Sequence, residues 1–95
     1  MRKLAILTPA NGVFVRAMIY DPADGRGVYL FLFRCPDDGP CEADHWCEDV
    51  QTAERLASEA FGIEPTDWQP IPDPQPGCQH DRIAAVPFSH PALPA

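Results

Sequence analysis

The sequence predicts a small α+β domain of two layers, in which a mostly antiparallel sheet with the element order β-β-β-β-α-β carries one helix on one face and a proline-rich strap. Three observations predict it. Runs of apolar, β-branched and aromatic residues fill the first half of the chain, one apolar stripe at helical spacing follows, and five prolines then occur between residues 65 and 76. A chain of 95 residues supports a single core. We therefore expect one domain over residues 1–86 and a flexible C-terminal tail over residues 87–95.

Four strands are expected before the helix, over residues 4–8, 13–20, 28–33 and 44–48. The pair Asn11-Gly12, between the first two strands, readily adopts the positive φ angles of a tight hairpin turn. The third strand is apolar on both faces, which is typical of a strand that is covered from both sides or that presents one face to a partner.

Side-chain alternation divides this sheet into two faces. In the second strand the residues from Val13 to Ile19 at odd positions are suited to burial under the helix. The other face is expected to carry Phe14, Met18 and one side of the third strand, so the proline strap, the tail or a second subunit must cover it. In the fourth strand we expect Trp46 to point inward and Cys47 to be a small buried apolar residue.

The strongest local pattern is the helix. Apolar residues between Val50 and Phe61 recur at the spacing of a single helical stripe. Asp49 precedes it as an N-cap, and Gly62 follows in the place of a left-handed C-cap. Leu56 and Phe61 are expected to be its main contacts with the core.

After the helix, the prolines of residues 65–76 favour an extended course and exclude a central strand. Trp68 and Ile71 are apolar, so we expect this segment to lie over the domain as a strap. A last strand is expected over residues 82–86, because this stretch is short and mostly apolar.

Charge is distributed unevenly along the chain. The net charge is −7; residues 1–34 hold five basic side chains against two carboxylates, whereas residues 35–95 hold two against twelve. An acidic surface of this kind repels phosphate backbones, so nucleic acid is not an expected partner. The longest apolar run has six residues, so no membrane span is expected. The apolar start stops at Thr8-Pro9, too short for a secretory core, and a cytoplasmic protein is therefore the expectation.

Function is most plausibly that of a protein-interaction or accessory module, with no catalytic residue assigned. A basic protein is the favoured partner, and self-association is the alternative. The candidate contact residues are carboxylates of the acidic segment and the two tryptophans: Asp37, Asp38, Glu42, Asp44, Trp46 and Trp68. The competing interpretation is an acidic face that only confers solubility, with both tryptophans in the core.

A small zinc-binding protein is the second hypothesis, and no other cofactor is expected. Thiolates and imidazoles are suitable zinc ligands, although no C-x2-C knuckle occurs. The candidate ligands are Cys41, Cys78 and His80, with His45 and Cys47 as further members. Free thiols or a Cys41–Cys78 bridge would account for the same residues. A Cys–His nucleophile lacks an identifiable orienting group, and no calcium-loop pattern is present.

The run from Trp68 to Asp81, which reads W-Q-P-I-P-D-P-Q-P-G-C-Q-H-D, resembles a segment shared by a group of short bacterial proteins to which no activity is attached. The resemblance extends to the G-V-Y-L-F run at residues 27–31, to Asp44 and Trp46, and to the helix end at residues 61–63. It implies kinship over most of residues 11–86 and no particular function.

Overall fold

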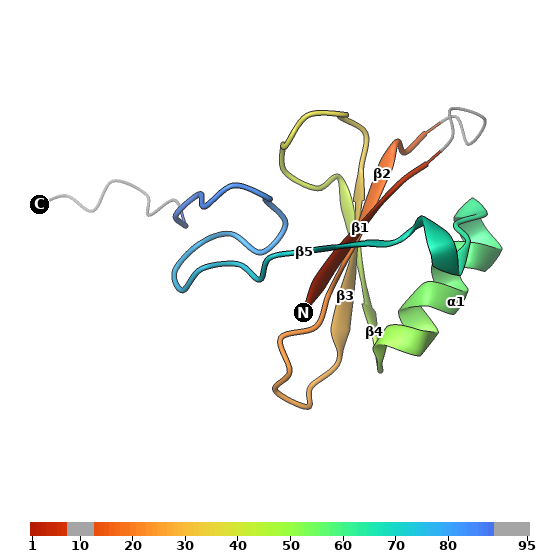
Figure 1. Cartoon of the computed structure of the whole chain (residues 1–95), viewed down its shortest axis with the longest axis horizontal. Coiled ribbons are helices and arrows are strands. Elements are labelled where there is room, and N and C mark those ends of the chain that lie inside the picture. The colour runs from red at the N-terminus through yellow and green to blue at the C-terminus, as the bar shows by residue number, and fades with distance from the viewer. Residues whose placement is uncertain (8–12, 89–95) are drawn as a thin grey trace, which may run out of the picture.

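The computed structural model describes residues 1–7 and 13–88 of the chain (Figure 1). Five strands form one antiparallel sheet in the order β4-β3-β2-β1-β5, with a single helix packed on it. The elements are β1 (Arg2–Ile6), β2 (Arg16–Tyr20), β3 (Val28–Phe33), β4 (Ala43–Cys47), α1 (Val50–Phe61), the short 3-10 turn η2 (Pro65–Asp67) and β5 (Gln69–Ile71). The predicted α+β class and the order β-β-β-β-α-β are confirmed, but the fifth strand is β5, inside the proline-rich stretch, and not the strand expected over residues 82–86. The expected Asn11-Gly12 turn lies outside the described residues, and no helix in residues 1–7 and 13–88 is long and apolar enough to cross a membrane.

Helix α1 covers one face of the sheet and begins and ends where the sequence predicts. The Asp49 carboxylate accepts the N–H of Thr52 at 2.7 Å, and Gly62 adopts φ 70° at the C-cap. The residues that α1 buries completely are Ala53 and Ala57. The expectation that Leu56 and Phe61 are the main contacts is wrong, because both are only partly buried. Two small side chains let the helix approach the sheet closely, and the larger ones pack at its flanks.

The opposite face of the sheet is built around Met18, Phe31 and Phe33, which form a second buried cluster. Phe14 does not join them as expected. It packs edge-on against Phe61 on the helix side, with ring centroids 5.9 Å apart. Strand β2 begins only at Arg16, so the alternation of the strand does not extend back to Phe14.

Two segments cover this second face, as the apolar pattern requires. One is the loop of residues 35–41, and the other is the stretch of residues 72–88, named here the C-terminal segment. In Figure 1 the C-terminal segment lies on the side of the sheet away from α1. The proline-rich stretch of residues 65–76, which overlaps the start of the C-terminal segment, is indeed a strap. It also supplies β5, whose Pro70 lies opposite Lys3 at the edge of the sheet. An edge strand tolerates proline, because one side of its backbone needs no partner.

The strand expected over residues 82–86 is absent. The N–H groups of Ile83 and Ala84 donate to the Asp38 carboxylate instead of to a neighbouring strand. Beyond that point the main chain is still paired: Pro87 forms an isolated bridge with Cys78, and the Phe88 N–H donates to the Gly77 carbonyl at 3.0 Å. Residues 89–95 of the predicted tail lie outside the described residues.

Candidate interaction surface

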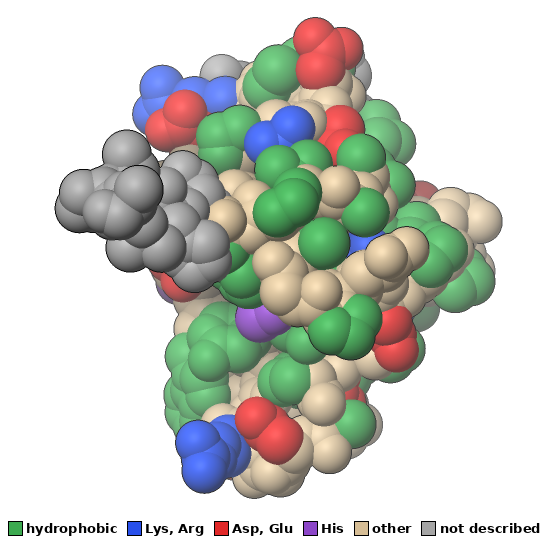
Figure 2. Space-filling model, turned by 90° about the vertical axis from the view of Figure 1, so that its left-hand side faces the viewer, with side chains coloured by type: hydrophobic (Ala, Val, Ile, Leu, Met, Phe, Trp, Pro, Cys, Tyr) green, Lys and Arg blue, Asp and Glu red, His purple; other side chains and the backbone are tan. Residues whose placement is uncertain are grey.

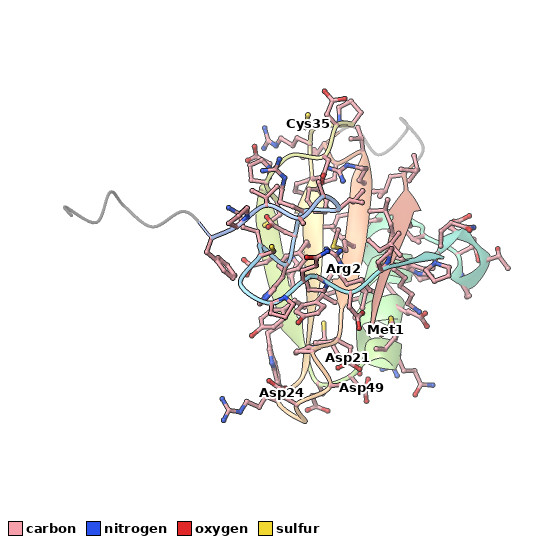
Figure 3. The ribbon with its side chains drawn as sticks, turned by 60° about the vertical axis from the view of Figure 1, so that its left-hand side comes forward. Met1, Arg2, Asp21, Asp24, Cys35 and Asp49 are labelled. Carbon is pink, nitrogen blue, oxygen red and sulfur yellow. The ribbon has the colours of Figure 1, made fainter. Side chains whose placement is uncertain are left out.

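Arg2 holds the C-terminal segment on the sheet. It lies on the face away from α1, near the middle of the sheet (Figure 3), and only 2% of it is exposed. Its guanidinium donates to the carbonyls of Pro72 at 2.7 Å, His80 at 3.0 Å and Arg82 at 2.6 Å. Burial lowers the pKa of Arg2, and the negative charges of Asp73 and Asp38 act against that shift. Three carbonyl oxygens replace the water that this buried cation has lost.

Arg16 performs the same task for the loop of residues 35–41. It donates from Nε to the Cys35 carbonyl at 3.0 Å and from Nη2 to the Asp37 carbonyl. Its guanidinium lies 4.0 Å above the centre of the Phe33 ring, a cation–π contact inside the second cluster. The covering segments on this face are therefore both attached by buried arginines from neighbouring strands.

The predicted acidic contact residues occupy different environments. Asp38 faces its own chain: it accepts the N–H groups of Ile83 at 2.7 Å and Ala84 at 2.8 Å, and it lies 3.7 Å from Arg82 Nε. Burial acts to raise the pKa of Asp38, but these two amides and the nearby arginines outweigh it and lower the pKa overall. Asp37 and Glu42 are exposed, and Asp44 lies exposed on β4.

The two tryptophans also differ in how much of each side chain is exposed. Trp68 is buried in the helix-side core with 7% of its surface exposed, and the Lys3 ammonium lies 5.8 Å from its ring. Trp46 does not point inward as expected: 59% of it is exposed. The adjacent Cys47 takes the buried position under α1, as predicted, and alternation then turns Trp46 to the other face. Of the six predicted contact residues, only Asp44 and Trp46 lie on the same exposed part of this face.

Strand register places three aromatic side chains side by side. Tyr20 of β2 lies opposite Tyr29 of β3, and Tyr29 lies opposite Trp46 of β4. This aromatic row becomes more exposed toward the β4 edge, from a half-buried Tyr20 through Tyr29 at 37% to Trp46. In residues 1–7 and 13–88, the ring contact over Tyr20 comes from His80, at 4.8 Å between centroids. The row is covered at one end and open at the other.

The exposed Trp46 is held in a fixed position. Its Nε1–H donates to the Arg26 carbonyl at 2.8 Å, and its ring lies directly over Gly27. A Cβ atom at position 27 would overlap the indole and lie 2.7 Å from the Cys47 carbonyl oxygen, and Gly27 itself has φ 111°. Glycine is therefore required here so that the turn can support the indole. A fixed exposed aromatic ring binds with little loss of conformational entropy.

An open hollow of about 280 Å³ adjoins the aromatic row, and we name it the aromatic hollow. Its lining combines ring faces with two carboxylates and contains no Lys or Arg; the lining residues are Tyr20, Pro22, Asp24, Tyr29, Phe31, Asp44 and His80. Figure 2 shows this side of the molecule, with hydrophobic side chains gathered over its middle and charged side chains at its upper and lower ends. Burial and the negative charge of Asp73 raise the pKa of Tyr20, while Arg2 acts to lower it.

The predicted zinc ligands are divided between the two faces of the sheet. Cys47 is buried on the α1 side, and His45 projects to that same face from the exposed edge strand. Cys78 and His80 lie in the C-terminal segment across the sheet. In the part of the chain that the structure describes, no three His, Cys, Asp or Glu side chains are grouped as metal ligands. Zinc binding stays a prediction of the sequence.

Cys41 is a half-buried thiol beside Asp81. The Cys41 N–H donates to the Asp81 carboxylate at 2.8 Å. Burial, together with the hydrogen bond and negative charge of Asp81, raises the pKa of Cys41 to about 11. The thiol is therefore protonated near neutral pH, and it is a free thiol in this structure, as are Cys35, Cys47 and Cys78.

Sequence reasoning missed most of this surface. Tyr20 and Tyr29 carry no signal in the sequence beyond that of strand residues, and Asp24, between two expected strands, carries none beyond that of a loop residue. The signal that the sequence offers is the position of each aromatic residue within its strand. Which of these residues lie next to one another follows only once the strand register is known. The buried role of Arg16 carries no signal beyond a charged residue inside an apolar run, and Arg2 stands beside Lys3 before the expected first strand, so nothing in the sequence marks it for burial.

Comparison of the chain with protein-family models, with curated proteins and with solved structures gives no match.

Proposed function

We propose that this chain is a protein-interaction module that binds a basic partner through the aromatic row and the carboxylates beside it. The observation that carries this proposal is the fixed, exposed Trp46 at the open end of three aromatic rings in register. Tryptophan and tyrosine supply most of the binding energy in many protein interfaces, because they bury a large area with few rotatable bonds.

Charge selects the class of partner. Asp24 and Asp44 line the hollow beside the row, and the lining contains no basic side chain. A basic protein segment is attracted to this surface, whereas a nucleic-acid backbone is repelled by it. A second copy docking symmetrically would place the same carboxylates against each other, and each copy carries a net charge of −7. A basic partner is therefore favoured over self-association.

The test uses defined peptides. Labelled oligoarginine and oligolysine of equal length are titrated with the full chain, and oligoglutamate serves as the negative control. We expect the basic peptides to bind and to be released as the salt concentration rises from about 0.05 to 0.5 M. Replacing Trp46 with Ala should cost at least about 1 kcal/mol of binding free energy. Glu64→Gln, which removes an exposed carboxylate beside η2 that lines neither the aromatic hollow nor the hollow beside Trp46, should leave the affinity nearly unchanged.

Two results would contradict the proposal. The first is that neither basic peptide binds at low salt. The second is that both bind equally well to the wild-type chain and to the Trp46→Ala variant, which would place the contact elsewhere on the acidic surface.

A further inference from the structure

One side of the aromatic hollow is lined by stacked aromatic rings. The rings of Tyr29 and Phe31, two residues apart on β3, are nearly parallel, at 4° to each other with centroids 6.0 Å apart. The Tyr20 ring, in contact with His80, contributes further aromatic surface. Phe31 is buried in the sheet cluster, so its ring is held in place by packing and not only by the strand.

Two carboxylates from different elements complete the hollow. Asp44 comes from β4, where it lies opposite Phe31 in the strand register. Asp24 comes from the turn between β2 and β3, where its Oδ1 accepts the Arg26 N–H at 2.9 Å. That hydrogen bond fixes the Asp24 carboxylate and leaves it a second oxygen for a ligand. Of the nearby cations, the Arg2 guanidinium is already directed at three carbonyls of the C-terminal segment.

Flat rings beside carboxylates are suited to one kind of group in particular. A guanidinium is planar and cationic, stacks on aromatic faces and donates five N–H groups in a plane. A lysine ammonium has no flat surface and holds its water more strongly. A neutral ring would stack on Tyr29 but would not neutralise the negative charge of either carboxylate.

We propose that the aromatic hollow binds the guanidinium of an arginine side chain from the basic partner, stacked on the exposed Tyr29 ring and hydrogen-bonded to Asp24 and Asp44. This inference rests on the proposed function and adds the group that is recognised. Trp46 then supplies contact area at the edge of the sheet, while the hollow selects arginine over lysine.

The experiment compares oligoarginine with oligolysine of equal length at low salt, using the full chain, the Trp46→Ala variant and four further variants. Tyr29→Leu removes the ring, and Tyr29→Phe retains it as the matched control. Asp44→Asn removes one carboxylate, and Glu64→Gln removes an exposed carboxylate of equal charge beside η2, outside the aromatic hollow. We expect the wild-type chain to bind oligoarginine about three- to tenfold more tightly than oligolysine. Tyr29→Leu and Asp44→Asn should each abolish most of that preference, whereas the two controls should retain it.

The outcomes separate the two proposals. If both peptides bind with equal affinity, and Trp46→Ala weakens both while Tyr29→Leu and Asp44→Asn change neither, the arginine assignment is overturned and the proposed function stands. If neither peptide binds, both proposals fail. If Tyr29→Leu lowers the melting temperature strongly, Asp44→Asn decides the result, since Asp44 is exposed and its replacement leaves the sheet core intact.

Discussion

Replacing Arg2 with Met is expected to release the C-terminal segment from the sheet. Methionine fills a similar volume on the strand but has no N–H group to offer the carbonyls of residues 72, 80 and 82. Hydrogen bonds from a charged donor contribute about 1.5–3 kcal/mol each, before the cost of burying the charge is subtracted. That cost amounts to several kcal/mol for an ion. We therefore expect a net loss of about 2–4 kcal/mol.

Two measurements detect this loss of stability. In a domain of this size, each kcal/mol lost lowers Tm by about 4–8 °C. Amide hydrogen exchange then shows where the loss occurs: the N–H groups of Gln79 and Phe88, which donate to Val86 and Gly77 carbonyls, should lose more protection than the Val15 N–H, which donates to the Phe33 carbonyl of β3.

The matched control is Arg26→Met, because Arg26 is exposed. It should leave both Tm and exchange nearly unchanged. The reasoning is refuted if Arg2→Met keeps the wild-type Tm and the Gln79 and Phe88 amides keep their protection, since the guanidinium would then not be what holds the segment.

Three further predictions concern other contacts. The pKa of Asp38 is lower in the folded protein than the usual carboxyl value of 3.8. The ionised Asp38 carboxylate therefore stabilises the C-terminal segment fully above pH 3.8, and this stabilisation is lost as the pH falls through the pKa of the folded state. Asp38→Asn should flatten that part of an acid-unfolding curve. Cys41, with a pKa of about 11 against an ordinary 9.0, should be alkylated about a hundredfold more slowly at pH 8 than an unperturbed thiol. Asp81→Asn retains an acceptor for the Cys41 amide but removes the negative charge, so it should accelerate the alkylation. Equal alkylation rates in the wild-type chain and the variant would contradict the role of Asp81 in raising this pKa. Gly27→Ala should cost about 1–3 kcal/mol in chemical denaturation and displace Trp46, which a shift in tryptophan fluorescence detects; an unchanged midpoint and spectrum would show that the turn accommodates a side chain.

The fold was largely predictable because its signals are local. The apolar stripe of α1, its Asp49 cap and the doubly apolar run of β3 each lie within one element. The last strand was placed wrongly for a physical reason. Residues 82–86 have the composition of a strand, but the carboxylate of Asp38, far away in the sequence, takes the N–H groups that a strand would pair.

The site was less predictable because it depends on register. Composition and charge pointed to an acidic interaction surface, and Asp44 and Trp46 belong to the surface proposed here. The pairing of Tyr20 with Tyr29 and of Tyr29 with Trp46 depends on turn lengths and on where each strand begins. A local pattern also cannot show that Asp38 faces its own chain while Asp44 faces outward.

The hydrogen bonds from Arg2 to main-chain carbonyl oxygens have an evolutionary consequence. Every residue type supplies the same peptide carbonyl, so the identities of residues 80 and 82 are not constrained by this contact. What it constrains is the length of chain between residues 72 and 82, since one inserted or deleted residue would carry an acceptor out of reach. The Arg2 contact by itself therefore permits substitutions at residues 80 and 82, and it opposes insertions and deletions between residues 72 and 82.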